Sequence, residues 1–311
     1  MKIAVIGAGL SGLAVSYYLL QSPQCSVTLF DAKGIGTGAS GVSSGLLHPY
    51  PAADGKRSFR ADLALKETKE LLQQVQPFSQ TALFSAEGIL REAWTEDQRL
   101  RFLSHIENYK DVEHYKDNLF LIRSALIIHM PRYLEALWAA CAERGAGLEI
   151  QTIDSLESCS NYDFIVIAAG WGIRHFQECA HLRVQYVKGQ KLICHTAETI
   201  PYSMMSKKYM TKMESAHHFE IGSTYERGFE DDQPCLEAAL KDLLSSKERF
   251  LKDAKIVDCK AAVRVARKEG YLPIAEKIGP RAYVLTGMGS RGLLYHAYYG
   301  KLLAQSILAE L

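Results

Sequence analysis

A Gly-rich turn between a short apolar strand and a helix constrains this chain more than any other feature. Near the N-terminus the sequence reads KIAVIGAGLSGLAVSYYLL, in which Gly7, Gly9 and Gly12 have the spacing G-x-G-x-x-G. Residues with helical periodicity follow the glycines, and the run SVTLFD then restores a strand that ends at Asp31. This β-α-β order predicts a parallel sheet that binds a dinucleotide.

Each residue type in this motif has a physical role. Gly7 permits the tight turn, Gly9 lets a pyrophosphate approach the backbone, and Gly12 allows the helix to pack closely on the strand. The helix N-terminus offers amide donors to the pyrophosphate, and Asp31 is placed to accept hydrogen bonds from an adenosine ribose. The alternative is a packing turn that binds no ligand. The residues assigned to the cofactor here are Gly7, Ala8, Gly9, Leu10, Ser11, Gly12, Asp31 and Ala32.

Composition and charge narrow the class of protein. The 311 residues are 48% hydrophobic and carry a formal charge of +1, so we expect a globular chain with no overall attraction to nucleic acid or an anionic membrane. The apolar N-terminal run is interrupted by glycines, which favours a strand and a helix over a signal peptide or a membrane span. Seven widely spaced cysteines, without a C-x-x-C pair, suggest reduced thiols in the cytoplasm, and we expect no metal site.

A second stretch of small residues, GTGASGVSSGLLHP, follows the second strand directly. Its backbone can lie close to a bulky planar ligand, although a flexible surface loop is the alternative. We assign four of its residues to the cofactor site: Ala39, Ser40, Gly45 and Leu46. The stretch also contains G-x-S-x-G around Ser43, but it lacks the strand and helix that a hydrolase nucleophile elbow requires. The glycine motif by itself leaves NAD and FAD both open.

The order of the elements indicates a discontinuous α/β architecture. Helices are expected over residues 58–75, 130–146 and 234–252, and a long helix closes the chain after the loop TGMGSRGLL. Pro131 suits a first helical turn and Gly145 a C-terminal cap. Strand, helix and strand patterns at the start, near residues 131–170 and after residue 256 are interrupted by two segments with the alternation of antiparallel strands.

Six stretches, in this order, carry a family resemblance: IAVIGAGLSGLAVSYYLL…VTLFD, GASGVSSGLLHP, FIVIAAG, VKGQ, IGSTYERG and TGMGSRGLL. With them the chain resembles the D-amino-acid oxidase-like (DAO) flavoproteins, a family that includes glycine oxidase and the oxidoreductase half of a bifunctional tRNA wobble-uridine enzyme. The resemblance implies noncovalent FAD in a Rossmann-like domain, formed by residues 1–77, 129–182 and 256–311. A smaller antiparallel-sheet substrate domain would comprise residues 78–128 and 183–255.

The resemblance also implies site residues. The loop after the last strand would pass beside the flavin ring, and the final helix would direct its N-terminus at the pyrimidine edge. The further cofactor residues are Ala169, Gly170, Trp171, Gly287, Gly289, Ser290, Arg291, Gly292 and Leu293. Arg264 and Arg291 would orient a substrate carboxylate, Tyr209 would border the substrate, and His48 would lie near the ring. Cys259 is the nearest late cysteine to a position for covalent flavin attachment.

The function implied is oxidation of a C–N bond in an amino acid or secondary amine, with hydride transfer to flavin N5. One alternative is the same oxidation on a carboxymethylaminomethyl group of tRNA, with phosphate contacts from Lys56, Arg57 and Arg60 or from the lysines of MSKKYMTK, Lys207, Lys208 and Lys212. A second alternative is a flavin- or NAD-binding sensor without turnover. The sequence leaves open the amine, the electron acceptor and the oligomeric state.

Overall fold

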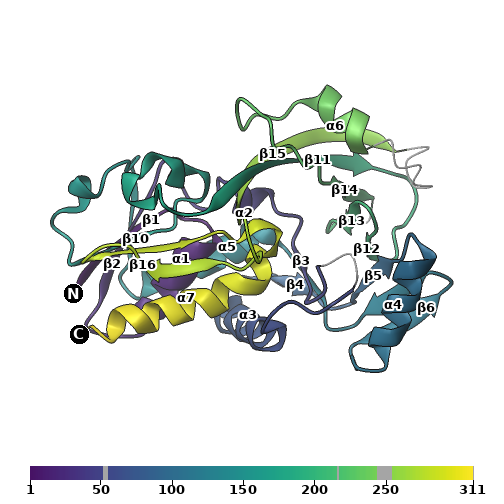
Figure 1. Ribbon diagram of the computed structural model, residues 1–311, viewed down its shortest axis with the longest axis horizontal. Coiled ribbons are helices and arrows are strands. Elements are labelled where there is room, and N and C mark those ends of the chain that lie inside the picture. Colours follow the sequence, from purple (N-terminus) through teal and green to yellow (C-terminus); the bar gives the residue numbers. More distant parts are fainter. Residues whose placement is uncertain (52–54, 216, 244–253, 311) are drawn as a thin grey trace.

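A computed structural model describes residues 1–51, 55–215, 217–243 and 254–310 of the chain. The fold has two large sheets with a small three-stranded sheet between them (Figure 1). None of the helices in the described ranges has the length and apolar character needed to cross a bilayer. The predicted α/β class is confirmed by the first of these sheets, while the division into a cofactor domain and a substrate domain stays a prediction.

The first sheet has six strands in the order β16-β17-β10-β1-β2-β9, all parallel to their neighbours except β16. The strands are β1 (Lys2–Ile6), β2 (Ser26–Asp31), β9 (Gly147–Ile150), β10 (Phe164–Ile167), β16 (Ile274–Lys277) and β17 (Ala282–Thr286). Four of the five residues of β1 are buried, as expected for a central strand covered on both faces. Segments from the start, middle and end of the chain therefore form one sheet, as the sequence predicted.

Helices pack on one face of this sheet and short 3₁₀ turns on the other. The helices are α1 (Leu10–Leu19), α3 (Ala61–Val75), α5 (Met130–Glu143) and α7 (Gly292–Leu308). α7 crosses α1 at Gly300, where an added Cβ would lie 3.0 Å from the Ala14 Cβ. On the opposite face, the sheet is covered by Ile173 of the 3₁₀ turn Gly170–His175 and by Phe176, which lies between this turn and the next one at Gln177–Cys179.

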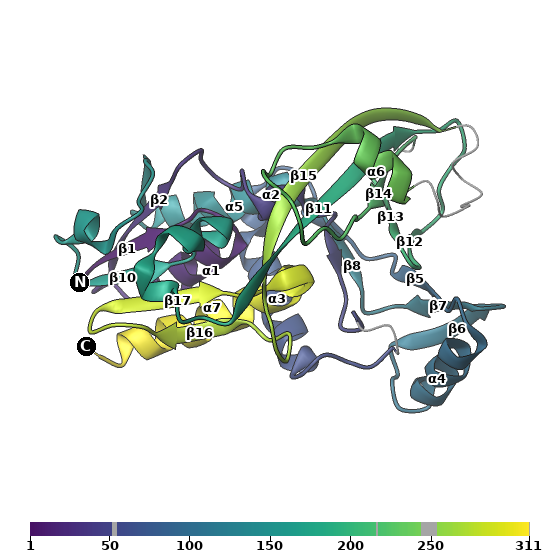
Figure 2. The same ribbon diagram turned by 45° about the horizontal axis from the view of Figure 1, so that its top comes forward.

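The second sheet has eight strands in the order β15-β11-β14-β13-β12-β5-β7-β6. They are β5 (Ile89–Glu92), β6 (Val112–Lys116), β7 (Leu119–Ile122), β11 (Val184–His195), β12 (Ser203–Met205), β13 (Tyr209–Lys212), β14 (His218–Gly222) and β15 (Lys255–Arg267). β11 and β15 form a long antiparallel ribbon that runs from the first sheet to the far side of the molecule (Figure 2). β15 therefore lies in the second sheet, whereas the sequence boundary at residue 256 grouped it with the first.

The remaining elements connect the two sheets or cover their edges. The small sheet consists of β3 (Leu46–Leu47), β4 (Phe84–Ser85) and β8 (Leu126–Ile128), and the remaining helices are α2 (Ala39–Val42), α4 (Glu96–Ile106) and α6 (Leu236–Leu243). The helix predicted over 234–252 is observed as α6, and residues 244–253 lie outside the described residues. The helix predicted from residue 58 begins at Ala61, because Arg60 has a left-handed φ of 50°.

Candidate active site

A cavity of about 940 Å³ lies between the two large sheets. This volume is at the upper end of the range for ligand sites in proteins and suits a ligand larger than an amino acid. The C-terminal ends of β1, β2, β10 and β17 form its floor. In the sheet order β1 lies between β2 and β10, so the connections that follow these strands leave on opposite sides of β1. Ligands of open α/β sheets bind at this edge.

The first glycine loop lies in this floor and has the geometry that its sequence predicted. Gly7 has a φ of +106°, and a Cβ there would lie 2.3 Å from the Ala168 carbonyl oxygen. A Cβ at Gly12 would lie 1.8 Å from the Gly7 carbonyl oxygen, so this glycine serves helix packing. Gly9 immediately precedes α1 and has no side chain that could cap the helix. The Ser40 hydroxyl of α2 accepts a hydrogen bond from the backbone amide of Leu10, at the start of α1, at 3.0 Å.

Asp31 holds the backbone around this loop. Its carboxylate accepts from the amides of Ala8 at 2.9 Å, Lys33 at 2.9 Å and Gly34 at 3.0 Å. A carboxylate has about four acceptor positions, so a ribose hydroxyl can still be accepted beside these three amides. The carboxylate thus has a structural role that the sequence pattern did not reveal, in addition to the predicted role in ribose binding.

The second glycine loop borders the same cavity. Gly287 and Gly289 have φ values of +73° and +54°, which only glycine adopts readily. The loop leads through a 3₁₀ turn into α7, whose N-terminus also borders the cavity. Met288 pairs with Ala266 of β15, so the loop is attached to the long ribbon of the second sheet.

Most of the predicted site residues are brought together here. The predicted residues that line the cavity are Gly7, Gly9, Leu10, Ser11, Asp31, Ala32, Ala39, Ser40, Leu46, His48, Ala169, Gly170, Trp171, Tyr209, Arg264, Gly287, Gly289, Ser290, Gly292 and Leu293. Ala8, Gly12, Gly45 and Arg291 are not among the lining residues. The Arg291 guanidinium instead donates to the Tyr271 carbonyl at 3.4 Å and lies over the Tyr271 ring.

The far wall of the cavity is one face of the second sheet. Gly189 and Gly222 leave this face open, so that larger side chains lie flat across it. A Cβ at Gly189 would lie 2.7 Å from Arg264 Nη2, and a Cβ at Gly222 would lie 2.4 Å from the Tyr209 hydroxyl. Tyr209 and Arg264 therefore lean toward each other over the sheet. Burial raises the pKa of Tyr209 and lowers that of Arg264, so the phenol is neutral and the guanidinium stays charged at neutral pH.

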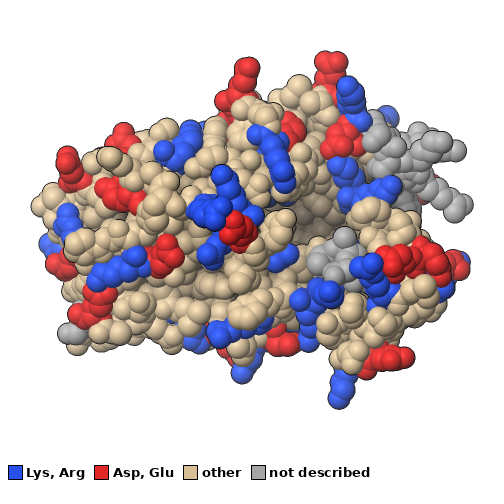
Figure 3. Space-filling view, in the orientation of Figure 1, with Lys and Arg blue, Asp and Glu red and all other residues tan. Residues whose placement is uncertain are grey.

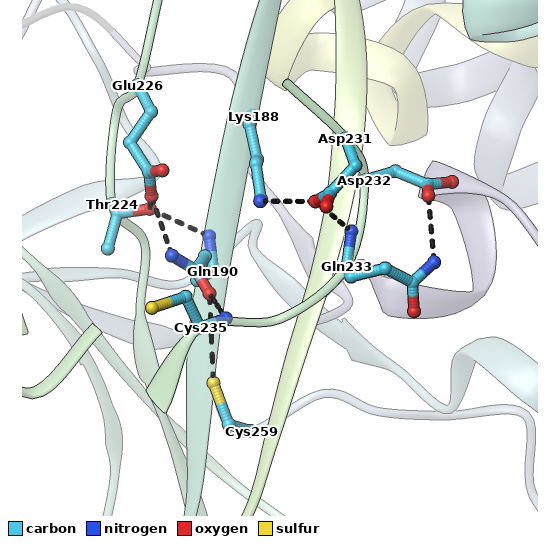
Figure 4. Close-up of polar contacts among 9 residues, drawn as sticks. All are labelled: Lys188, Gln190, Thr224, Glu226, Asp231, Asp232, Gln233, Cys235 and Cys259. Carbon is cyan, nitrogen blue, oxygen red and sulfur yellow. Dashed lines mark hydrogen bonds and ion pairs between the residues drawn. The ribbon is translucent and has the colours of Figure 1, made fainter. Parts of the chain in front are cut away.

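Arg264 bonds to the Thr224 segment, which is held in turn by a polar network around Gln190 (Figure 4). The Arg264 guanidinium donates to the Thr224 carbonyl at 3.2 Å. Gln190 of β11 holds the segment that contains Thr224 and Glu226. Its backbone N–H donates to Thr224 Oγ1 at 2.9 Å, and its side-chain Nε2 donates to the Glu226 carboxylate at 2.9 Å. The side-chain oxygen of Gln190 accepts from the Cys235 amide at 2.6 Å. Gln190 of the VKGQ stretch is thus a positioning residue that the sequence did not single out.

His48 lines the cavity and is affected by the charges of two arginines. Desolvation, together with the charges of Arg91 and Arg291, lowers the pKa of His48 to about 3. The His48 Nδ1 accepts from the Tyr50 amide at 3.3 Å, which assigns the proton of the neutral ring to Nε2. Arg91 was missed from the sequence, since a single Arg in the short strand β5 gives no indication of which face it occupies. Cys259 is not among the lining residues, so the cavity provides no support for covalent attachment there.

Basic side chains lie on several sides of the hollow in the face shown in Figure 3. Those proposed to bind RNA phosphates largely have partners within the chain. Arg57 pairs with Asp62 at 2.6 Å and Asp111 at 3.1 Å, and Lys208 pairs with Asp242 at 2.6 Å. Lys212 pairs with Glu87 at 3.0 Å, and Lys207 lies over the Trp94 ring. These pairs reduce the charge available to a polyanion.

Comparison with known proteins identifies the fold's family. A family model described as FAD dependent oxidoreductase (DAO) matches residues 2–306. The chain belongs to this family. The two glycine loops, the amides at the start of α1 and the volume of the cavity fit FAD, which members of the family use.

Individual relatives agree with this assignment. The tRNA 5-methylaminomethyl-2-thiouridine biosynthesis bifunctional protein MnmC of Maricaulis maris is 25% identical over 319 residues, which cover 99% of this chain and 52% of that protein. The chain thus spans about half the length of this curated relative. The structure of glycine oxidase from Geobacillus kaustophilus superposes with a TM-score of 0.82 and 20% identity, covering 99% of this chain and 95% of that one. Iminodiacetate oxidase from Chelativorans sp. BNC1 gives 0.81 and 19%, with coverage of 99% and 95%.

Proposed function

We propose that this FAD-dependent oxidoreductase oxidises the C–N bond of a small amino acid or secondary amine, with FAD bound noncovalently in the cavity. The observation that carries the proposal is the Arg264 guanidinium, which lies flat over Gly189 and faces the cavity that both glycine loops line. Two structural neighbours, glycine oxidase and iminodiacetate oxidase, are named for the oxidation of amino acids that carry carboxylates.

The proposed roles follow from charge and geometry. Bound FAD supplies a two-electron acceptor for hydride from the carbon next to the amine nitrogen. Arg264 binds the substrate carboxylate through its planar fork, and Thr224 and Gln190 hold that fork in place. The positive charges of Arg91 and Arg264, which line the cavity, also lower the pKa of a bound substrate ammonium. This favours the neutral amine, which is the form that is oxidised. His48 is neutral at neutral pH with its proton on Nε2, so we expect it to act as a hydrogen-bond donor and not as a cation.

An amine panel tests the proposal. The purified FAD-loaded protein is mixed anaerobically with glycine, N-alkylglycines, D- and L-amino acids and carboxymethylaminomethyl-modified tRNA, while the flavin absorbance is followed. At least one small carboxylate-bearing amine should bleach the flavin. Arg264→Ala should raise KM by about tenfold to a hundredfold, which corresponds to about 1.4 to 2.8 kcal/mol. Arg291→Ala should have a smaller effect, because the Arg291 side chain reaches Tyr271. A flavin that no amine in the panel reduces would refute the proposed function.

A second candidate is the same oxidation on tRNA. The similarity to the tRNA-modifying protein over 99% of the chain favours it, while the ion pairs of Arg57, Lys208 and Lys212 oppose it. Binding to RNA should then fall steeply as salt rises. Bleaching by the modified tRNA alone, with salt-dependent binding, would select this candidate over a small amine.

A further inference from the structure

Two cysteines of the second lobe contact one polar side chain. The backbone amide of Cys235 donates to the side-chain oxygen of Gln190 at 2.6 Å, and the Cys259 thiol donates to the same oxygen at 3.9 Å (Figure 4). The Cys235 nitrogen and the Cys259 sulfur are therefore no further apart than the sum of these two distances. Both thiols are free, and the proposed oxidation of amines uses neither of them.

The packing of the second sheet also brings these two cysteines to one face. Cys259 lies opposite Leu192 in the pairing of β15 with β11, so it shares a face with Gln190, two residues earlier in β11. Helix α6 covers this face, because its Ala239 belongs to the apolar cluster of Leu192, against which Cys259 packs. Cys235 comes directly before the first turn of α6, so the packing of this helix keeps Cys235 over the same face.

The exposure of the two thiols gives them different roles toward an oxidant. Cys235 is exposed and Cys259 is half-buried. Four other cysteines are buried: Cys141, Cys159, Cys179 and Cys194. Burial raises the pKa of the Cys259 thiol, and the nearby charges of Asp258 and Cys235 raise it further, so little Cys259 thiolate is present at neutral pH. An oxidant in solution therefore meets Cys235 first, and Cys259 is placed to react with the product.

A disulfide between these residues requires only a local movement. The Cα atoms of disulfide-bonded cysteines are typically about 4.4–6.8 Å apart. Residues 231–235 lie outside helices and strands, and they are held to β11 by the ion pair of Asp231 with Lys188 at 3.3 Å and by the bond from Cys235 to Gln190. A shift of this short segment and rotation of the two side chains can join the sulfurs without rearranging the sheet.

We propose that Cys235 and Cys259 are a reversible thiol–disulfide pair that a peroxide oxidises, which ties the start of α6 to β15. In the first step the Cys235 thiolate attacks hydrogen peroxide, giving a sulfenic acid and hydroxide. The Cys259 thiol then attacks the sulfenic sulfur, which forms the S–S bond and releases water. Overall, two thiols lose two electrons and two protons, and one hydrogen peroxide becomes two water molecules. A dithiol reverses the bond by exchange.

The bond would restrain the wall that faces the substrate. It would fix residues 231–235, of which Asp232 lines the cavity, and it would act on Gln190, which holds the Thr224 segment bonded to Arg264. Hydrogen peroxide forms when oxygen reoxidises a reduced flavin, so a flavoprotein can meet this oxidant in its own surroundings. The inference does not depend on the proposed function, because formation of the disulfide requires no amine substrate.

Thiol mapping tests the proposal directly. The FAD-loaded protein is reduced, freed of reductant, exposed to an equimolar amount of hydrogen peroxide and alkylated, and its peptides are identified by mass spectrometry. We expect peptides joined through Cys235 and Cys259 in most molecules, and their separation after treatment with dithiothreitol. The thermal unfolding midpoint of the oxidised protein should rise, because the bond restricts the unfolded chain. Amide hydrogen exchange in residues 231–235 should slow.

Matched variants separate this pair from the other thiols. Cys235→Ser and Cys259→Ser should each abolish the joined peptides and the rise in the unfolding midpoint. Cys25→Ser is the control, since it removes another half-buried thiol, directly before β2, and should leave both effects intact. Flavin content shows whether each variant is folded, and the mapping of the wild type needs no variant.

Three results would overturn the proposal. The first is a wild-type protein in which both thiols stay free in peroxide or in which Cys235 is oxidised without joining Cys259. The second is a disulfide between Cys259 and Cys194, which lies in the same apolar cluster. The third is a joined peptide of Cys259 that persists in a folded Cys235→Ser protein. The amine panel decides the proposed function separately, because it is read from the flavin absorbance of protein with reduced thiols.

Discussion

Gly189 lies beneath the Arg264 guanidinium, and its substitution by alanine should impair the substrate site without weakening the fold. The added Cβ would lie 2.7 Å from Nη2, 3.1 Å from Cζ and 3.4 Å from Nε of Arg264. Real Cβ contacts at such positions are about 3.4 Å or more, so the guanidinium must move by about 0.7 Å. The atoms that must move are the end of a flexible side chain, which can shift without displacing the backbone.

This displacement should appear in binding and catalysis. Misplacement of a positioning group by about 1 Å can cost about a hundredfold in rate, so Gly189→Ala should lower kcat/KM for a carboxylate-bearing amine by about tenfold to a hundredfold. The free energy of unfolding should stay the same or rise by about 0.5 kcal/mol, because alanine is favoured over glycine within a strand. Steady-state kinetics and urea unfolding measure the two effects on the same preparation.

Two controls make this prediction specific. Gly228→Ala introduces the same methyl group where, among the described residues other than its two chain neighbours, no heavy atom lies within 4 Å of the added Cβ, and kcat/KM should not change. In an Arg264→Gln background, Gly189→Ala should have little further effect, because the two changes act on one interaction. Unchanged kcat/KM in Gly189→Ala, or a full additional loss in the double variant, would refute the reasoning.

Three further changes act on the cofactor side of the molecule. Gly12→Ala places a Cβ 1.8 Å from the Gly7 carbonyl oxygen, so α1 must move away from β1. FAD binding, measured by flavin fluorescence, should be lost, and retained binding would contradict the packing role of Gly12. Asp31→Asn removes one acceptor from a carboxylate that holds three amides, and should lower the free energy of unfolding by about 1 kcal/mol in denaturant titrations; an unchanged value would contradict this. His296 is fully buried, and burial lowers its pKa to about 4, below the unfolded value of about 6.5. The unfolded state then binds more protons, so the free energy of unfolding should fall by about 3 kcal/mol from pH 6.5 to pH 4; His296→Gln should remove this share of the pH dependence, and an unchanged slope would contradict it.

The cofactor side of the fold could be predicted because its rules are local. Gly7, Gly9 and Gly12 follow a buried strand and open a helix, and the structure has β1, α1 and β2 in those positions. The predicted cap at Gly145 is confirmed by its φ of +84° after α5. The stretch GASGVSSG was expected to be a loop, and it contains the short helix α2, because single-turn helices have no periodicity to detect.

The substrate side could be predicted only in part, because side-chain direction there depends on pairing between distant strands. Arg264 and Tyr209, to which the family resemblance assigned substrate contacts, both line the cavity, whereas the Arg291 side chain lies against Tyr271. Arg91 faces the cavity through its pairing with Met205, which lies more than a hundred residues away in sequence. In a strand of four residues, alternation does not indicate which face is covered.

The ribbon of β11 and β15 has a mechanical consequence for how substrates enter. The same strand carries Arg264 and, through the pairing of Ala266 with Met288, holds the loop at the start of α7. A hinge that swung the second sheet outward would therefore pull the loop along with the arginine. With FAD and substrate bound as proposed, we expect access through movement of shorter segments around the mouth, while Arg264 and the loop at the start of α7 keep a constant distance.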